Sequence, residues 1–130
     1  MDAEDLKDLF RDFGPVSVRR MFGGQGVFVD GVMIALVARD VIHLKADEQT
    51  VPDFEGEGCT PFTYATKNGE HTLTSYWRMP ARLYDDPEEL ARWARDAHAV
   101  AQRSAVRQRK PISGRKTVAR GNAKKARKRP

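Results

Sequence analysis

The spacing of apolar residues predicts a short helix at the start of the chain. Four apolar residues recur at intervals of three and four and therefore share one helical face: Leu6, Leu9, Phe10 and Phe13. Asp2 stands where a helix cap is expected, and Asp5 lies near the positive end of the helix dipole. The dipeptide Gly14-Pro15 then ends the helix, because glycine tolerates a left-handed cap and proline cannot continue the helix.

Beyond this helix the apolar period changes to two, which predicts antiparallel strands. Asp30-Gly31 lies between two β-rich runs and suits a type I′ hairpin, in which both turn residues need positive φ. A third strand follows Arg39-Asp40, and a second hairpin turns at Asn68-Gly69. Residues 47–61 are acidic and rich in glycine and proline, so we expect a loop there with one helical turn near residues 48–51.

The last regular element predicted is a helix that begins at the sequence DDPEEL. Asp86 is the expected cap, and Pro87 occupies the first helical position, where its missing N–H costs nothing. An apolar stripe follows at helical spacing: Leu90, Trp93, Ala94, Ala97, Val100 and Ala101. Pro111 limits the helix on its far side.

The segment RRMFGGQGVFVDG raises the question of a nucleotide site, because its centre resembles a phosphate-binding loop. A Walker loop needs Gly-Lys-Ser/Thr after its glycines, and a dinucleotide fingerprint needs a following helix, whereas here a strand and a hairpin follow. We therefore expect Gly23, Gly24 and Gly26 to let the chain turn or bulge between two strands, with positive φ at Gly24 and Gly26. No cofactor is expected.

Candidate catalytic chemistry is sparse. His43, His71 and His98 fall in a strand, a hairpin and the last helix, and none has the spacing of a metal ligand. Cys59 lies in an acidic loop that should raise its pKa and reduce its reactivity, and Ser75 lacks a nucleophile elbow. We therefore expect a protein that is not an enzyme and holds no metal.

Charge divides the chain into two parts. Twelve of the 23 basic residues lie between Arg103 and Pro130, where there is no acidic residue, which leaves eleven against 18 acids in residues 1–102. The body is thus near −7 and the tail near +12. We expect a folded domain over residues 1–104 and a disordered tail over residues 105–130, since the tail has almost nothing to bury.

A tail of this composition is typical of a nonspecific nucleic-acid arm, because cations without interspersed anions can follow a phosphate backbone. The competing interpretation is a solvated arm that contacts only the acidic body. The tail residues expected to bind nucleic acid are Arg107, Arg109, Lys110, Arg115, Lys116, Arg120, Lys124, Lys125, Arg127, Lys128 and Arg129.

The N-terminus is acidic where a signal peptide would be basic, and no apolar run is long enough to span a membrane. Together with a single cysteine, this favours a cytoplasmic protein with no membrane partner.

Several side chains of the body are candidates for partner contacts. Arg19 and Arg20 precede the glycine segment, and Arg78 ends the later strand. Adjacent strand residues face opposite sides, so only one of the first two can share a patch with Arg78. By the same alternation, one of Tyr76 and Trp77 should fill the core, and the other should pack elsewhere or meet a partner.

Two motifs in order carry a family resemblance: R-x-MFGG-x-G, then SYW-x-x-P, followed by a helix containing EELARWARDA. Over about residues 4–102 the chain resembles the N-terminal domain of the TfoX/Sxy family, bacterial regulators associated with natural competence. The motif residues, which have structural or partner-contact roles, are Arg20, Met21, Phe22, Gly23, Gly24, Gly26, Tyr76, Trp77, Arg78 and Pro80.

The resemblance implies a two-layer α+β fold similar to secretion chaperones. A curved antiparallel sheet of about five strands is packed by an N-terminal helix and a long C-terminal helix. It also implies an accessory role beside a transcription activator of the cyclic-AMP receptor protein type, with no established catalytic residues. Full-length members carry a helical C-terminal domain; here we expect the basic tail to stand in its place.

These observations together predict a non-enzymatic accessory regulator of transcription or competence. Its folded domain would contact protein and its tail would bind nucleic acid. The alternative is a protein-interaction or chaperone-like module with no dedicated DNA role. We expect the body to form a homodimer, since a domain with one sheet layer tends to leave a face or a strand edge to cover.

Overall fold

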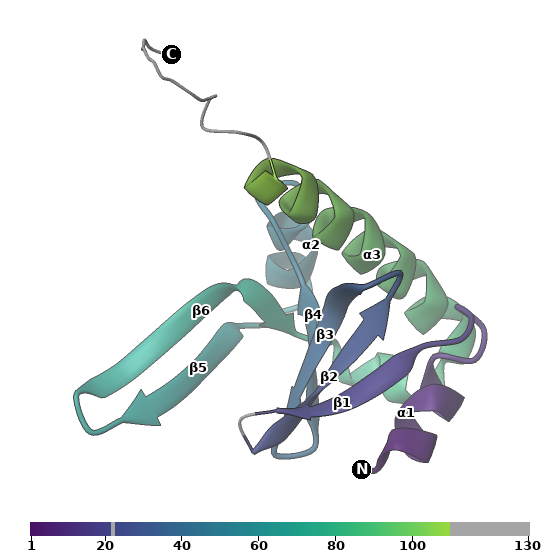
Figure 1. Cartoon of the computed structure of the whole chain (residues 1–130), viewed down its shortest axis with the longest axis horizontal. Coiled ribbons are helices and arrows are strands. Elements are labelled where there is room, and N and C mark those ends of the chain that lie inside the picture. The colour runs from purple at the N-terminus through teal and green to yellow at the C-terminus, as the bar shows by residue number, and fades with distance from the viewer. Residues whose placement is uncertain (22, 110–130) are drawn as a thin grey trace, which may run out of the picture.

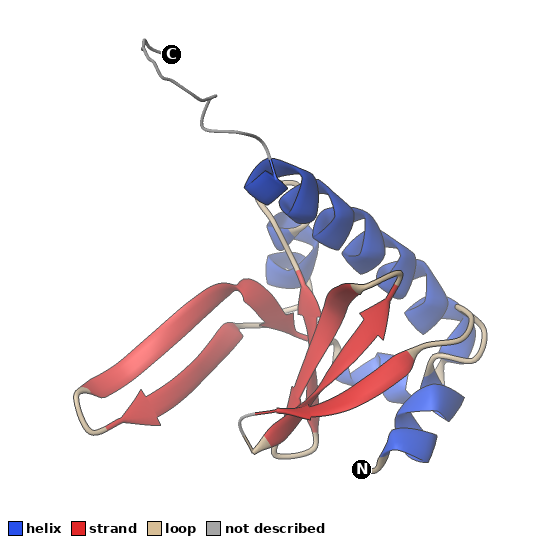
Figure 2. Ribbon diagram, in the orientation of Figure 1, coloured by secondary structure: helices blue, strands red, loops and turns tan. Residues whose placement is uncertain are grey.

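The computed structural model describes residues 1–21 and 23–109 and shows an α+β fold with helices packed on one side of a single antiparallel sheet (Figures 1 and 2). The helices are α1 (Ala3–Leu9), α2 (Val51–Gly56), the 3-10 helix η1 (Ala81–Asp85) and α3 (Pro87–Arg109). The strands are β1 (Ser17–Met21), β2 (Gly24–Val29), β3 (Val32–Ala38), β4 (Val41–Lys45), β5 (Pro61–Thr66) and β6 (Gly69–Arg78).

The six strands lie in the order β1-β2-β3-β4-β6-β5, and every neighbouring pair is antiparallel. The predicted α+β class is confirmed, with six strands in place of about five. Two of the predicted turns are present: Asp30 and Gly31 have φ of 53° and 78°, and Arg39 and Asp40 have φ of 53° and 62°. Positive φ at both central residues matches the right-handed twist of the strands that each turn joins. The turn predicted at Asn68-Gly69 lies one residue earlier, at Lys67-Asn68, because Thr66 pairs with Gly69.

The predicted N-terminal caps of the first and last helices are confirmed by their hydrogen bonds, whereas α1 ends at Leu9 and not at Gly14-Pro15 as predicted. Asp2 and Asp5 form a capping box, each side chain accepting a hydrogen bond from the backbone N–H of the other. Asp86 accepts a hydrogen bond from the Glu89 N–H at 3.2 Å and so caps α3. Helix α3 continues to Arg109, so residues 105–109, which the sequence analysis assigned to the tail, are helical.

The segment between β4 and β5 differs from the sequence prediction. In place of a loop with one turn at residues 48–51, it contains helix α2, with a proline in its first turn. Phe54 anchors this helix: its ring lies 5.0 Å from that of Trp93 and 6.2 Å from that of Trp77. Burial of one aromatic side chain therefore fixes a short helix that the local sequence did not predict.

The core fills the space between the sheet and the helices. The strand residues buried there are Val27, Ile34, Ala35, Val37, Ile42, Leu44 and Trp77. The helical residues that meet them include Leu6, Phe10, Leu90, Ala94, Ala97 and Ala101. The alanines of α3 carry little side-chain volume, so this helix packs close to the middle of the sheet.

A hairpin arm projects from the body (Figure 1). We call the outer part of β5 and β6, residues 62–74, the arm. The register jumps where the arm leaves the sheet: Pro61 pairs with Trp77, but the next residue, Phe62, pairs with Leu73. The extra residues on β6 form a bulge, which bends the strand so that its two ends pair with different neighbours.

Candidate functional site

The glycine segment forms the tight hairpin between β1 and β2, and the three glycines serve different purposes. Gly23 has a φ of +75° and supplies the turn. Gly24 and Gly26 lie in β2 without positive φ, so the expectation of positive φ there was wrong. A Cβ on Gly24 would collide with the Val37 carbonyl oxygen. A Cβ on Gly26 would meet two methionine sulfurs and the Phe28 ring at 2.7–2.8 Å.

An open hollow of about 800 Å³ adjoins this hairpin. Arg20 and Arg39 line it together with Asp40 and the first residues of the chain. The N-terminal amino group donates a hydrogen bond of 2.7 Å to Asp40, and this bond raises the pKa of the amino group. Charges of both signs therefore line the hollow, which suits contact with a polar protein surface.

The register places Arg19 and Arg78 on the same face of the sheet. A row of directly opposed residues crosses five strands: Arg19, Gly26, Leu36, His43 and Arg78. Opposed residues in an antiparallel sheet share a face, so Arg19 joins Arg78 and Arg20 faces the other way. This face carries none of the core residues that meet the helices, and we call it the open face.

The two motif aromatics lie on opposite faces, as the alternation predicted. Trp77 packs in the core, and its indole N–H donates to the Thr74 carbonyl at 3.0 Å. Tyr76 lies on the open face beneath Lys45, whose ammonium is 4.8 Å from the ring centroid. Both side chains are buried, and burial raises the pKa of Tyr76 to about 12. Pro80 immediately precedes η1 and is buried as well.

A row of rings continues from the open face onto the arm. His43 meets Phe62 edge to face at 4.9 Å. The Phe62 ring is followed by Tyr64 at 5.8 Å, and Tyr64 by His71 at 5.5 Å, both with nearly parallel planes. Tyr64 and Leu73 are 42% and 37% exposed, more than most large apolar residues of the described chain. This row could not be predicted from the sequence, because the β6 bulge, which aligns the arm with the open face, has no signature there.

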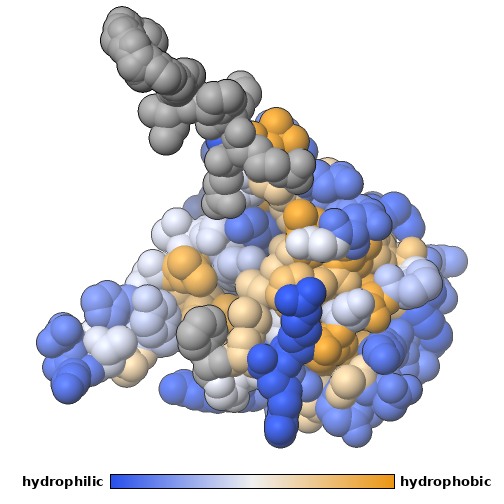
Figure 3. Space-filling model, in the orientation of Figure 1, coloured by the Kyte–Doolittle hydropathy of each residue, from blue (hydrophilic) through white to orange (hydrophobic). Residues whose placement is uncertain are grey.

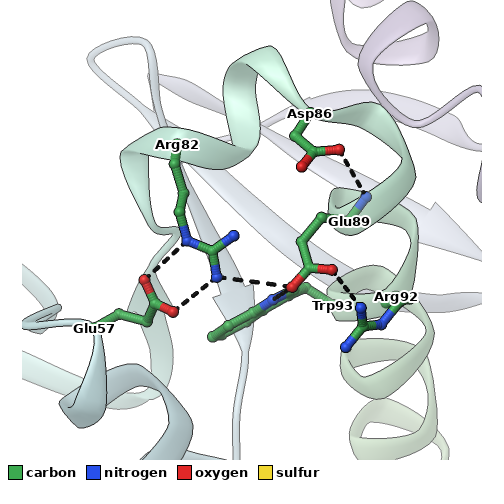
Figure 4. A network of polar contacts seen from close by, with 6 residues as sticks. All are labelled: Glu57, Arg82, Asp86, Glu89, Arg92 and Trp93. Atoms are coloured by element: carbon green, nitrogen blue, oxygen red, sulfur yellow. Dashed lines mark hydrogen bonds and ion pairs between the residues drawn. The ribbon is translucent and has the colours of Figure 1, made fainter.

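The helical side of the molecule holds a polar network instead (Figure 4). Arg82 donates to both carboxylate oxygens of Glu57, at 3.1 and 2.7 Å, and lies 3.7 Å from Glu89. Glu89 also pairs with Arg92 and accepts a hydrogen bond from the Trp93 indole. The bond from Arg82 lowers the pKa of Glu57. Glu57 and Glu89 each have a basic partner, so the network fastens α2 and η1 to α3.

Two cations near the end of α3 are bound to the body. Arg103 donates two hydrogen bonds to Asp47, at 3.1 and 2.8 Å, and Arg107 lies 3.3 Å from Glu48. Burial would raise the pKa of Asp47, but the hydrogen bonds from Arg103 and nearby backbone N–H groups lower it on balance. Arg109 is the last residue of α3. The remaining predicted nucleic-acid contacts, from Lys110 onward, and the motif residue Phe22 lie outside the described residues.

The histidines and the cysteine stand apart from one another. Within residues 1–21 and 23–109, no three side chains of His, Cys, Asp or Glu come together as a metal site. Burial raises the pKa of the Cys59 thiol, and Glu57 raises it further, which confirms the predicted direction. His98 lies 3.3 Å from Asp30, though without hydrogen-bond geometry. The helices described here include none that is long and apolar enough to cross a membrane.

Comparison with known proteins agrees with the motifs. The family model of the TfoX N-terminal domain matches residues 8–101, which include both the glycine hairpin and the strand that ends at Arg78. A search of curated proteins finds no match. The matched range extends from α1 to the last turns of α3 and so covers every strand of the sheet. The chain therefore belongs to the TfoX N-terminal domain family.

Proposed function

We propose that this protein is a non-enzymatic, cytoplasmic accessory regulator of transcription or competence. Its folded domain contacts a protein partner, and its basic tail binds nucleic acid without sequence preference. Membership of the TfoX N-terminal domain family supports the regulatory role. The partner implied by the family resemblance is a transcription activator of the cyclic-AMP receptor protein type.

The observation that carries the nucleic-acid role is the division of charge. All charged residues of the tail are basic, while the body has a net negative charge. Each phosphate that a cation neutralises releases condensed counterions, with a slope of about −0.9 in log K against log salt per contact. If half to two-thirds of the twelve cations from Arg103 onward engage, the slope is about −5 to −7. Sequence preference should be slight, because the tail has no aromatic side chain to stack on bases.

The surface best suited to the protein partner is the hollow beside the β1–β2 hairpin. It contains the motif residues Arg20, Gly23 and Gly24 and presents charges of both signs. Arginine is enriched at protein interfaces, where its planar head can form several hydrogen bonds at once.

The test is fluorescence anisotropy with a mixed-sequence duplex across a salt series. The full chain is compared with a variant of equal length in which the nine cations from Lys110 to Arg129 are replaced by glutamine. We expect the full chain to bind the duplex with a steep dependence on salt, and the variant to lose this binding. Equal binding by the two proteins would refute the tail as the nucleic-acid arm.

The ion pairs at the end of α3 make a sharper prediction. Glu48 competes with phosphate for Arg107, so Glu48→Gln should strengthen duplex binding at low salt. An exposed pair contributes about 0.2–1 kcal/mol, which limits the gain to about fivefold. Glu55→Gln removes the same charge from α2, where no described residue pairs with Glu55, and serves as the matched control. Equal gains from both variants would indicate a general charge effect instead of competition for Arg107.

The second candidate is a chaperone-like homodimer without a dedicated DNA role. The projecting arm and its exposed apolar side chains favour it. Sedimentation of the protein at tens of micromolar, with and without nuclease treatment, distinguishes a dimer from a complex held together by nucleic acid.

A further inference from the structure

The open face carries positive charge only. None of the 18 acidic residues lies in β1 to β5, and only Glu70 lies in β6. The acids are gathered on the helices, the turns and the segment around α2. The open face itself presents Arg19, Lys45 and Arg78. A body with a formal charge near −7 therefore has one face that attracts an anion.

The same face is apolar between its cations. Met21, Phe28 and Met33 surround Gly26, and the Arg19 guanidinium lies 4.5 Å from the Phe28 ring centroid. In the space-filling view, hydrophobic residues gather over the strands of the sheet, with hydrophilic residues set among them (Figure 3). Gly26 is buried beneath these side chains, so Met21, Phe28 and Met33 form the apolar middle of the face.

The arm extends this face with exposed rings. Phe62, Tyr64 and His71 form a continuous row beyond His43, and Leu73 lies opposite Phe62. The arm carries little charge of its own, with Lys67 at its turn and Glu70 beside it. A ligand on the arm would therefore be held by stacking and apolar contact. The cations of the open face, at the base of the arm, would attract the negative charge of that ligand.

We propose that the open face and the arm together bind single-stranded nucleic acid, separately from the tail. Bases stack on the arm rings, and backbone phosphates lie near Arg19, Lys45 and Arg78. A single strand exposes the faces of its bases, whereas a duplex stacks them internally and offers these rings nothing to stack on. The antiparallel sheet supplies the platform, because side chains at alternate positions of several strands project from one surface.

A second copy of the chain fits this face less well. Two open faces brought together would place Arg19, Lys45 and Arg78 close to their counterparts, and like charges in contact oppose association. Three cations with no carboxylate among them match a polyanion better. This proposal goes beyond the proposed function, which places nucleic acid on the tail alone.

The test uses the full chain and labelled strands of about sixteen nucleotides. Oligothymidylate, oligouridylate and a duplex of equal length are compared at a salt concentration where duplex binding has fallen at least about tenfold. Stacking is less sensitive to salt than phosphate contact, so we expect the protein to retain a preference for both single strands there. Tighter binding of oligouridylate would assign the surface to RNA, and equal binding would assign it to either kind of strand.

Two matched pairs of variants locate the site. Arg19→Gln and Arg20→Gln remove the same charge from adjacent residues on opposite faces of β1. Tyr64→Leu removes a ring from the row, and Thr63→Val alters the opposite face of the same strand. We expect Tyr64→Leu to lower single-strand affinity about tenfold, and Arg19→Gln to lower it more than Arg20→Gln. Thr63→Val should leave the single-strand affinity unchanged.

The outcomes separate this proposal from the tail and from a protein interface. Duplex binding at low salt should be the same in Tyr64→Leu as in the unaltered protein, because the tail carries it. If the single-strand preference is absent, or if both members of each pair behave alike, the tail is the only nucleic-acid site and the proposal is overturned. If sedimentation shows that Tyr64→Leu converts a dimer to a monomer while single-strand binding persists, the arm is a protein interface and the proposal is likewise overturned.

Discussion

At the scale of single residues, the β1–β2 hairpin shows how neighbouring glycines can be required for different reasons. Gly23 is needed for its backbone conformation, and a side chain there would meet open space. Gly24 is needed because a strand backbone lies where its Cβ would be, and Gly26 because side chains do. A backbone carbonyl held in a sheet moves less readily than a methionine side chain, so the two strand glycines should differ in their tolerance of substitution.

We therefore expect Gly24→Ala to destabilise the protein more than Gly26→Ala, with a loss of about 1–3 kcal/mol for overpacking at Gly24. Gly56→Ala is the control, because nothing lies within 4 Å of its Cβ position and it lies at the end of α2. That variant should be neutral or slightly stabilising. Urea unfolding of the three variants measures the order of their unfolding free energies. A larger loss at Gly26 would mean that the methionines on the open face cannot move aside.

His43 predicts a dependence of stability on pH. Burial lowers its pKa below the ordinary value of 6.5 and repulsion from Arg78 adds to this, although hydrogen bonds to backbone carbonyls oppose it. The unfolded chain therefore takes up the proton first as the pH falls below about 6.5, and the folded state loses stability until the folded pKa is passed.

His43→Gln should reduce the difference in unfolding free energy between about pH 7.5 and pH 5.5. His71→Gln, at an exposed position of the arm, is the control and should leave that difference unchanged. An undiminished difference in His43→Gln would assign the pH dependence to other groups.

At the scale of elements, the helices with strong end signals were predictable, and those fixed by tertiary contact were not. The capping carboxylates Asp2 and Asp86 can be read from the sequence because a cap acts within four residues. Helix α2 could not be predicted, since it depends on Phe54 meeting two tryptophans distant in sequence. The arm and the open face were missed for the same reason, because the bulge in β6 aligns residues that the alternation alone places on separate surfaces.

The capping box of α1 gives a prediction at this scale. Asp2→Ala removes the acceptor for the Asp5 N–H and should cost about 1 kcal/mol of stability. Asp12→Ala removes an equal charge from an exposed residue that makes no hydrogen bond or ion pair with the described residues, and it should cost much less. Chemical denaturation of both variants measures the difference. Equal losses of stability would show that the charge alone, and not the cap, stabilises the N-terminal end of α1.

At the scale of the whole molecule, the helix α3 connects the folded body to the basic tail. Apolar contacts with the core continue to Ala101, and the ion pairs of Arg103 and Arg107 extend the attachment beyond them. The charge division could be counted from the sequence, but the attachment could not, because it requires Asp47 and Glu48, which follow β4, to lie beside the end of α3.

We expect a chain that ends after Arg109 to keep the thermal midpoint of the full protein, since the described core lies within residues 1–109. Ending the chain after Ser104 removes the last turn of α3 together with Arg107 and should lower the midpoint by a few degrees. About 1 kcal/mol corresponds to some 4–8 °C for a domain of this size. Scanning calorimetry of both truncated chains measures the two thermal midpoints. A substantial loss in the longer one would mean that the tail packs on the body.

The turn at the tip of the arm also makes this protein a practical scaffold. Residues 66–69 are exposed and lie at the far end of the arm, beyond the bulge that separates the arm from the core. Extra residues inserted there cost only loop-closure entropy, about 0.6 kcal/mol for each doubling of loop length. A peptide tag, a reporter or a second domain can therefore be grafted between Lys67 and Asn68 without disturbing the packing of the sheet against its helices.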